Sequence, residues 1–133
     1  MGVIAARVAF AMALLAGVAS VARAAESFEF TRIAACDDEH DPYGPDRLVA
    51  ERKNERLVVT DWAGVTCGVV PADPEVVPDW GTLTLKLAFK TDGPVATCRC
   101  TTKFQFTLFE NVPSGRTIYF VKDGNGAAHA TAP

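Results

Sequence analysis

Four cysteines constrain the fold of this 133-residue chain more than any other feature. They are Cys36, Cys67, Cys98 and Cys100, and all of them follow an apolar N-terminal stretch. An even number of cysteines in a small exported chain predicts a framework of disulfides. The alternative is a metal site that combines these thiols with His40. Zinc-binding cysteine pairs are separated by at least two residues, which Cys98-Arg99-Cys100 does not match, so we predict two disulfides.

Strand geometry restricts how the cysteines pair. Cys98 and Cys100 lie in a segment that alternates like a β-strand, so their side chains point to the same face and diverge from each other. Each of them is therefore expected to pair with Cys36 or Cys67, which leaves two connectivities open. A disulfide contributes about 2–4 kcal/mol to the free energy of unfolding. Two of them would supply a large part of the ~5–15 kcal/mol of a typical domain.

The first 24 residues have the pattern of a cleaved secretory signal peptide. Arg7 precedes an apolar run, residues 8–21, that ends in the small-x-small motif Ala22-Arg23-Ala24. The run is shorter than the ~20 residues of a membrane-spanning helix, which makes a membrane anchor the less favoured interpretation. We expect a mature chain that begins at Ala25, is periplasmic or secreted, and has no membrane contact after cleavage.

The charge of the mature chain excludes one class of partner. Cleavage removes Arg7 and Arg23, which changes the net charge from −3 to −5. A nucleic-acid-binding protein needs a basic surface to neutralise phosphates. We therefore expect no nucleic-acid partner.

Alternation of apolar and polar residues predicts strands through most of the mature chain. In residues 81–90, Leu83, Leu85, Leu87 and Phe89 share one face, as in a strand with one buried side. Residues 95–109 alternate in the same way. Shorter strands are predicted over residues 27–34, 48–51, 56–62, 65–70 and 116–121, and prolines and acidic residues predict loops over residues 36–46 and 71–79.

These patterns together predict an all-β fold. Several short strands, with turns between them and no amphipathic helix, indicate a small antiparallel β-sandwich, Ig-like or prealbumin-like and linked by disulfides. We assign residues 1–24 to the signal peptide, 25–126 to the β-sandwich domain and 127–133 to a disordered, alanine-rich tail.

One segment resembles a known family. Residues 109–124 read Phe-Glu-Asn-Val-Pro-Ser-Gly-Arg-Thr-Ile-Tyr-Phe-Val-Lys-Asp-Gly. They resemble the closing hairpin of prealbumin-like (transthyretin-like, Cna-B-type) β-sandwich modules of secreted bacterial proteins, which often read F-x-N-[LV]-P-x-G, then a strand, then D-x-x-G. The resemblance implies a β-sandwich with a stalk or accessory role. It covers only this segment, and the cysteine pattern of the chain is not that of the family.

An acidic loop at residues 36–46 is the candidate metal site. It contains Asp37, Asp38, Glu39, His40, Asp41 and Asp46, and Ca²⁺ prefers oxygen ligands of this kind. Pro42 occupies the place where an EF-hand requires glycine, and runs of charge are most often solvated. We therefore predict a solvated loop, with no metal and no other cofactor.

Trp62 and Trp80 are the candidate binding residues. Each is followed by a small residue. An exposed tryptophan combines apolar area with a polar edge, which suits it to bind sugars or peptides. The alternative is that both tryptophans cover the edge of the core.

Residues for catalysis are scarce in the mature chain. Its histidines are His40 and His129, and its serines, Ser27 and Ser114, have no nucleophile-elbow motif around them. We therefore predict a non-catalytic module with a binding or structural role in the bacterial envelope, whose partner is a protein or an envelope polymer. One alternative is a protease or hydrolase inhibitor that presents the loop at 36–46 or 71–80. A second is a small metal-binding protein or hydrolase that uses the His40 loop.

Overall fold

A computed structural model describes residues 27–37, 40–91, 93–94, 97–109 and 111–133. These residues form the strands β1 (Phe28–Asp37), β2 (Arg47–Lys53), β3 (Arg56–Thr66), β4 (Val69–Asp79), β5 (Thr82–Thr91), β6 (Arg99–Leu108), β7 (Thr117–Lys122) and β8 (Asn125–Thr131). The predicted signal peptide, residues 1–24, lies outside the described residues. The described part contains no candidate transmembrane helix.

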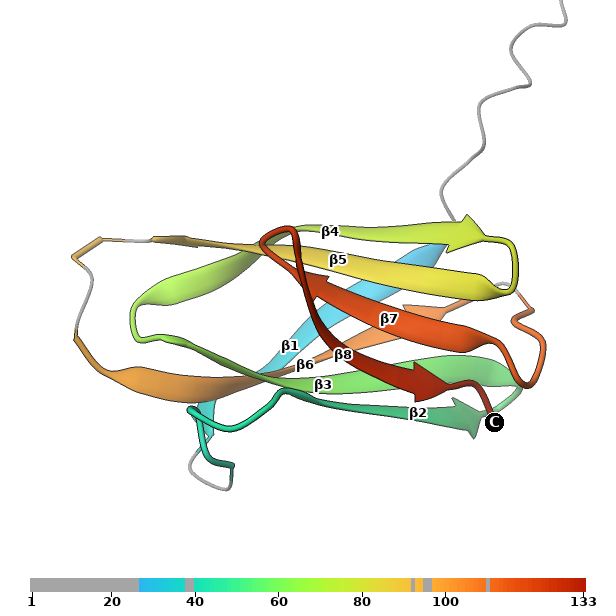
Figure 1. The fold of residues 1–133 in the computed structure, drawn as a ribbon, viewed down its shortest axis with the longest axis horizontal. Coiled ribbons are helices and arrows are strands. Elements are labelled where there is room, and N and C mark those ends of the chain that lie inside the picture. The colour runs from blue at the N-terminus through green and yellow to red at the C-terminus, as the bar shows by residue number, and fades with distance from the viewer. Residues whose placement is uncertain (1–26, 38–39, 92, 95–96, 110) are drawn as a thin grey trace, which may run out of the picture.

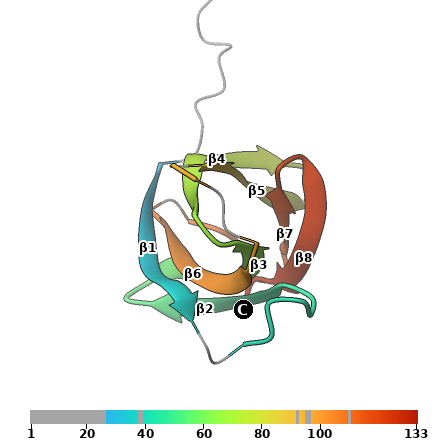
Figure 2. The same ribbon diagram turned by 90° about the vertical axis from the view of Figure 1, so that its left-hand side faces the viewer.

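The strands form two four-stranded sheets that pack face to face (Figure 1). One sheet has the order β1-β6-β3-β2, and the other has the order β4-β5-β7-β8. Seen end-on, β2 lies beside β8 and β1 approaches β4, so the two sheets enclose the core (Figure 2). The prediction of an all-β sandwich with disulfides is confirmed.

One strand pair departs from the antiparallel pattern. β5 and β7 run parallel, with Leu83 beside Ile118 and Leu85 beside Phe120. The reason is the path of the chain, which leaves β5, crosses to the other sheet as β6 and returns as β7. Such a pairing depends on strands that are distant in sequence, so local alternation does not reveal it.

The core contains the inward-facing residues of both sheets. Leu83, Leu85 and Leu87 of β5 are buried, as their alternation predicted. Phe104 of β6 lies near the centre, because its ring centroid is 5.5–6.2 Å from those of four other phenylalanines, Phe30, Phe89, Phe106 and Phe120. Burying a side chain of this size contributes about 1.5–3 kcal/mol to stability.

The prediction of a disordered tail over residues 127–133 is wrong. Asn125–Thr131 form β8, which pairs antiparallel with β7 after a turn at Asp123-Gly124. Ala132 is buried, and its backbone N–H donates a hydrogen bond to the carbonyl of Arg116 at 2.9 Å. Hydrogen bonds to β7 therefore order a segment whose alanines and glycines have little strand propensity of their own.

The segment at residues 71–79 was predicted to be a loop, and it is a strand. It belongs to β4, at the edge of its sheet. An edge strand leaves one row of N–H groups unused, so it accepts Pro71, Pro74 and Pro78. The register with β5 also shifts between Ala72 and Glu75, which places Pro74 at a bulge. β4 then runs directly into a tight turn that carries Trp80.

Candidate functional site

Two disulfides join the cysteines. They are Cys36–Cys100, with the Cα atoms 4.8 Å apart, and Cys67–Cys98, with the Cα atoms 5.4 Å apart. This is one of the two connectivities that strand geometry left open, and Cys98 and Cys100 are not bonded to each other. The first bridge ties β1 to β6, and the second ties the β3–β4 turn to the residue before β6. Both therefore restrain the same end of the sandwich.

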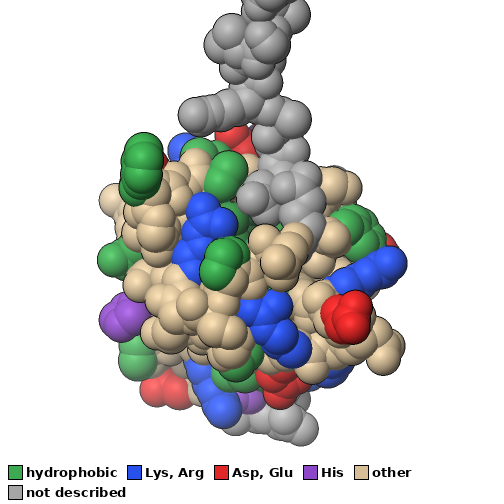
Figure 3. Space-filling view, turned by 90° about the vertical axis from the view of Figure 1, so that its right-hand side faces the viewer, with side chains coloured by type: hydrophobic (Ala, Val, Ile, Leu, Met, Phe, Trp, Pro, Cys, Tyr) green, Lys and Arg blue, Asp and Glu red, His purple; other side chains and the backbone are tan. Residues whose placement is uncertain are grey.

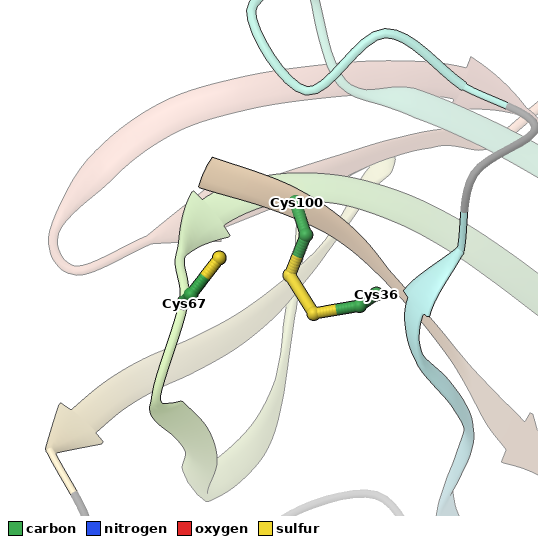
Figure 4. A group of neighbouring side chains, drawn as sticks. All are labelled: Cys36, Cys67 and Cys100. Atoms are coloured by element: carbon green, nitrogen blue, oxygen red, sulfur yellow. A yellow bond between two sulfur atoms is a disulfide. The ribbon is translucent and has the colours of Figure 1, made fainter. Parts of the chain in front are cut away.

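The sulfur atoms of the two bridges lie close together. Those of Cys36, Cys67 and Cys100 are all within 4.8 Å of one another (Figure 4). Reduced thiols at such spacing can bind metal ions as thiolates. In the structure each of these cysteines is part of a disulfide, so the group has no thiolate to offer.

The loop side chains that the structure describes, those of His40, Asp41 and Asp46, do not converge on one point. Asp41 Oδ1 accepts a hydrogen bond from the N–H of Tyr43 at 2.9 Å, which stabilises the local turn. Asp37 ends β1, where it pairs with Thr101 of β6. Asp38 and Glu39 lie outside the described residues. In the part of the chain that the structure describes, the three cysteines are the one group of potential metal ligands that lie close together.

Trp62 is half-buried on β3, and three other side chains lie around its ring. The ring of His40 is 5.2 Å from it, and the cationic groups of Arg47 and Lys103 are each 5.2 Å from its centroid. The backbone carbonyl of His40 also accepts a hydrogen bond from Thr101 Oγ1 at 3.1 Å. Trp62 therefore holds the acidic loop against the sheet. Each cation–π contact contributes about 0.5–1 kcal/mol at an exposed site.

A buried ionic cluster at this end has no recognisable sequence motif. Asp61, on the core side of β3, is fully buried. Nearby, Lys122 of the opposite sheet lies 3.0 Å from Asp46 Oδ2 and donates a hydrogen bond to the carbonyl of Gly64 at 3.0 Å. Burial raises the pKa of Asp61 well above its usual value, the Asp46 carboxylate raises it further, and Lys122 opposes both. The sequence signal was an inward position: Asp61 alternates in register with Leu57, Val59, Ala63 and Val65.

Gly64 allows the acidic loop to approach β3. A Cβ atom at this position would lie 2.2 Å from the carbonyl oxygen of Pro42. The Gly64 N–H donates a hydrogen bond to Asp46 Oδ1 at 3.2 Å, and its carbonyl accepts one from Arg99 Nη2 at 3.0 Å. Through these contacts the cluster links the acidic loop to both sheets.

Trp80 lies at the opposite end of the sandwich, at the tip of the β4–β5 hairpin, and is 95% exposed. Its backbone N–H donates a hydrogen bond to Asp79 Oδ1 at 2.7 Å. Gly81, with φ of 66°, closes the turn, and its carbonyl accepts a hydrogen bond from the N–H of Thr117 at 3.2 Å. Arg116 Nη2 donates to the Asp79 carbonyl at 2.8 Å. The exposed ring therefore projects from a turn that these hydrogen bonds stabilise.

The surface beside this ring is concave. A depression of about 480 Å³ is lined by Pro78, Asp79, Trp80, Gly81 and Arg116. Sequence reasoning identified Trp80 but not Arg116, which is far from it in sequence and reaches it through the β5–β7 pairing. An apolar ring, a guanidinium and a carboxylate around one hollow can bind a ligand that is both apolar and polar.

No family model, no curated protein and no solved structure matches this chain.

Proposed function

We propose that this protein is a non-catalytic, exported module of the bacterial envelope that binds its partner through the β4–β5 hairpin end. The observation that carries the proposal is the 95% exposure of Trp80 on a supported turn. Tryptophan is enriched among the residues that dominate binding energy. A rigid turn also lowers the conformational entropy that is lost when the ligand is bound.

Export is supported by two independent features. The N-terminal segment has a signal-peptide pattern, and two disulfides join all four cysteines. Disulfides persist in oxidising compartments such as the periplasm and the medium. We therefore place the module in one of these two locations.

The positions of Ser114 and of the two histidines favour a binding role over catalysis. Ser114 Oγ donates a hydrogen bond to the Pro133 oxygen at 3.0 Å, near the hairpin end. His40 packs on Trp62 in the acidic loop at the other end, and His129 packs near Tyr119 on the outside of the β7–β8 pair. Acid–base catalysis needs such groups within hydrogen-bonding distance of one another.

The inhibitor alternative has less structural support than the sequence suggested. One of its two candidate loops, residues 71–80, consists almost entirely of β4. In the other, residues 36–46, Pro42 packs against Gly64 of β3 and His40 packs against Trp62. The first segment therefore offers an enzyme cleft a strand and a single turn residue, Trp80, in place of an extended loop.

The test is binding to a bacterial envelope extract, with purified protein whose disulfides are intact. We expect Trp80→Ala to lower the apparent affinity about tenfold, because it removes the exposed anchor. Its free energy of unfolding should change by less than about 0.5 kcal/mol, as is usual for exposed positions. Tyr43→Ala is the matched control, since Tyr43 is 74% exposed at the opposite end. Equal binding by Trp80→Ala and the parent protein would refute the proposal.

A further inference from the structure

We infer that the hairpin end binds an acidic polysaccharide, with a sugar ring stacked on Trp80 and carboxylates paired with the neighbouring arginines. This inference rests on the proposed function and names the class of ligand. Four observations lead to it: the shape of this end, its charge, the separation of its aromatic residues and the blocked sheet edges.

The concave surface extends beyond Trp80. A second hollow of about 440 Å³ shares Gly81 and Arg116 with the first and continues to Pro113 and Ser114. A third, of about 690 Å³, is lined by residues that include Asn111, Phe109 and Arg56. The three hollows thus follow the β6–β7 segment across the end of the sandwich. A row of open hollows suits an extended polymer better than a compact small molecule.

The described residues that line these hollows carry more positive than negative charge. Three arginines, Arg52, Arg56 and Arg116, line the hollows, against two carboxylates, Asp79 and Glu55, whereas the whole chain has a net charge of −3. Basic side chains are interspersed with hydrophobic ones over the middle of this face, and acidic side chains lie toward its rim (Figure 3).

The contacts of two of these arginines leave their charges available. Arg116 donates to a backbone carbonyl, and the guanidinium of Arg56 lies 4.6 Å from the ring centroid of Phe109. Among the described residues, neither forms an ion pair with a carboxylate. Guanidinium groups bind carboxylates through paired hydrogen bonds, so these two are suited to an acidic ligand.

The two exposed aromatic residues of this end favour a carbohydrate over a protein. Trp80 and Phe109 line different hollows, with polar groups between them. A stable protein interface needs a contiguous, largely apolar centre within about 1,200–2,000 Å² of buried surface. A polysaccharide instead presents separate apolar ring faces between hydroxyls and carboxylates, and each face can pack on one aromatic side chain.

Docking of a peptide at a sheet edge is disfavoured. β4 carries three prolines and a bulge, β1 has two register shifts, and β2 and β8 lie beside each other. These features are the ones that protect edges against strand addition. The loops of the hairpin end are therefore the more accessible surface for a partner.

The experiment measures binding to polygalacturonate, alginate and hyaluronan by calorimetry, with fully methyl-esterified polygalacturonate as the uncharged control. We expect binding to at least one acidic polymer and none to the ester. Trp80→Ala and Arg116→Gln should each weaken binding about tenfold or more. Lys86→Gln removes a positive charge from an exposed position on β5, away from the hollows, and should have no effect. Raising the ionic strength from about 0.05 M to about 0.3 M should weaken binding, because charged contacts are screened.

The outcomes separate this inference from the proposed function. Binding to none of the acidic polymers, while envelope binding still depends on Trp80, would overturn the inference and leave the proposed function standing. The inference alone also fails if protease treatment of the extract abolishes binding, since the partner is then a protein. Equal binding to the methyl ester would overturn the role of the carboxylates. Envelope binding that is independent of Trp80 would overturn both.

Discussion

At the residue scale, Asp61 is the least expected feature of the core. Its carboxylate oxygens are buried and have no hydrogen-bond partner among the described residues. A charged carboxylate without such partners is costly in the interior, so the neutral acid is favoured. The neighbouring Asp46–Lys122 ion pair, 3.0 Å apart, lies at the edge of the same cluster.

Asp61 should make the stability of the protein depend on pH. The raised pKa means that the folded state holds this proton at pH values where the unfolded state, with a pKa near 3.8, has lost it. The contribution of Asp61 to the free energy of unfolding is therefore largest below pH 3.8 and is lost as the pH rises through the folded-state pKa. Asp61→Asn, which cannot ionise, should lose this decline and be more stable than the parent at neutral pH.

Urea unfolding at several pH values between about 3 and 8 would measure this effect. Asp41→Asn is a suitable control, since it removes an exposed carboxylate from the same end. A decline that persists unchanged in Asp61→Asn would show that another group causes it.

Gly64 gives a second prediction at this scale. Gly64→Ala places a methyl group against the backbone of Pro42, which forces the acidic loop away from β3. We expect a loss of about 1–3 kcal/mol in the free energy of unfolding. Gly126→Ala, where no atom lies within 4 Å of the added Cβ, should change it by less than about 0.5 kcal/mol. Equal stability of the two variants would contradict the close packing of the loop.

At the element scale, the two ends of the sandwich are stabilised differently. Disulfides restrain one end, whereas the hairpin end is held by the hydrogen bonds of its turns. The Cys67–Cys98 bridge holds the β3–β4 turn to the chain before β6, and the N–H of Cys67 also donates to the Cys98 carbonyl at 2.9 Å. The hairpin end thus has no disulfide of its own among the described residues.

Breaking this bridge should have a specific chemical consequence. Cys98→Ser frees the thiol of Cys67, whose sulfur lies within 4.8 Å of both sulfurs of the other bridge. We expect thiol–disulfide exchange that yields some Cys67–Cys100 or Cys36–Cys67 bridge, and a loss of about 2–4 kcal/mol in stability. Alkylation followed by peptide mass mapping would detect the new bridges. The double variant Cys67→Ser/Cys98→Ser cannot exchange and should retain only Cys36–Cys100; the same result in the single variant would contradict this prediction.

The strands differ in how far they could be predicted. β5 was predicted because Leu83, Leu85 and Leu87 alternate, and this pattern reflects burial directly. β4 and β8 were not, because prolines in one and alanines and glycines in the other have low strand propensity, and pairing with neighbouring strands decided the outcome.

At the scale of the whole molecule, the candidate site was only partly predictable. Trp62 and Trp80 have similar local sequences, yet the acidic loop covers one and leaves the other exposed. The difference arises from contacts between distant segments, as does the placement of Arg116 beside Asp79. The Asp46–Lys122 pair joins residues separated by 76 positions, which no local pattern could show.

The two ends of the sandwich therefore differ in structure. One end is held by two disulfides, the buried cluster and the loop that covers Trp62. The other presents Trp80 and the arginines around open hollows. A ligand should affect the second end and leave the first unchanged.

Tryptophan fluorescence tests this division most directly, because the chain has only two tryptophans. In Trp62→Phe the emission reports on Trp80 alone, and in Trp80→Phe it reports on Trp62 alone. When soluble envelope extract binds, we predict a blue shift and weaker acrylamide quenching for Trp80, with no change for Trp62. An unchanged Trp80 signal in a sample where binding is measured would contradict the assignment of the hairpin end as the binding surface.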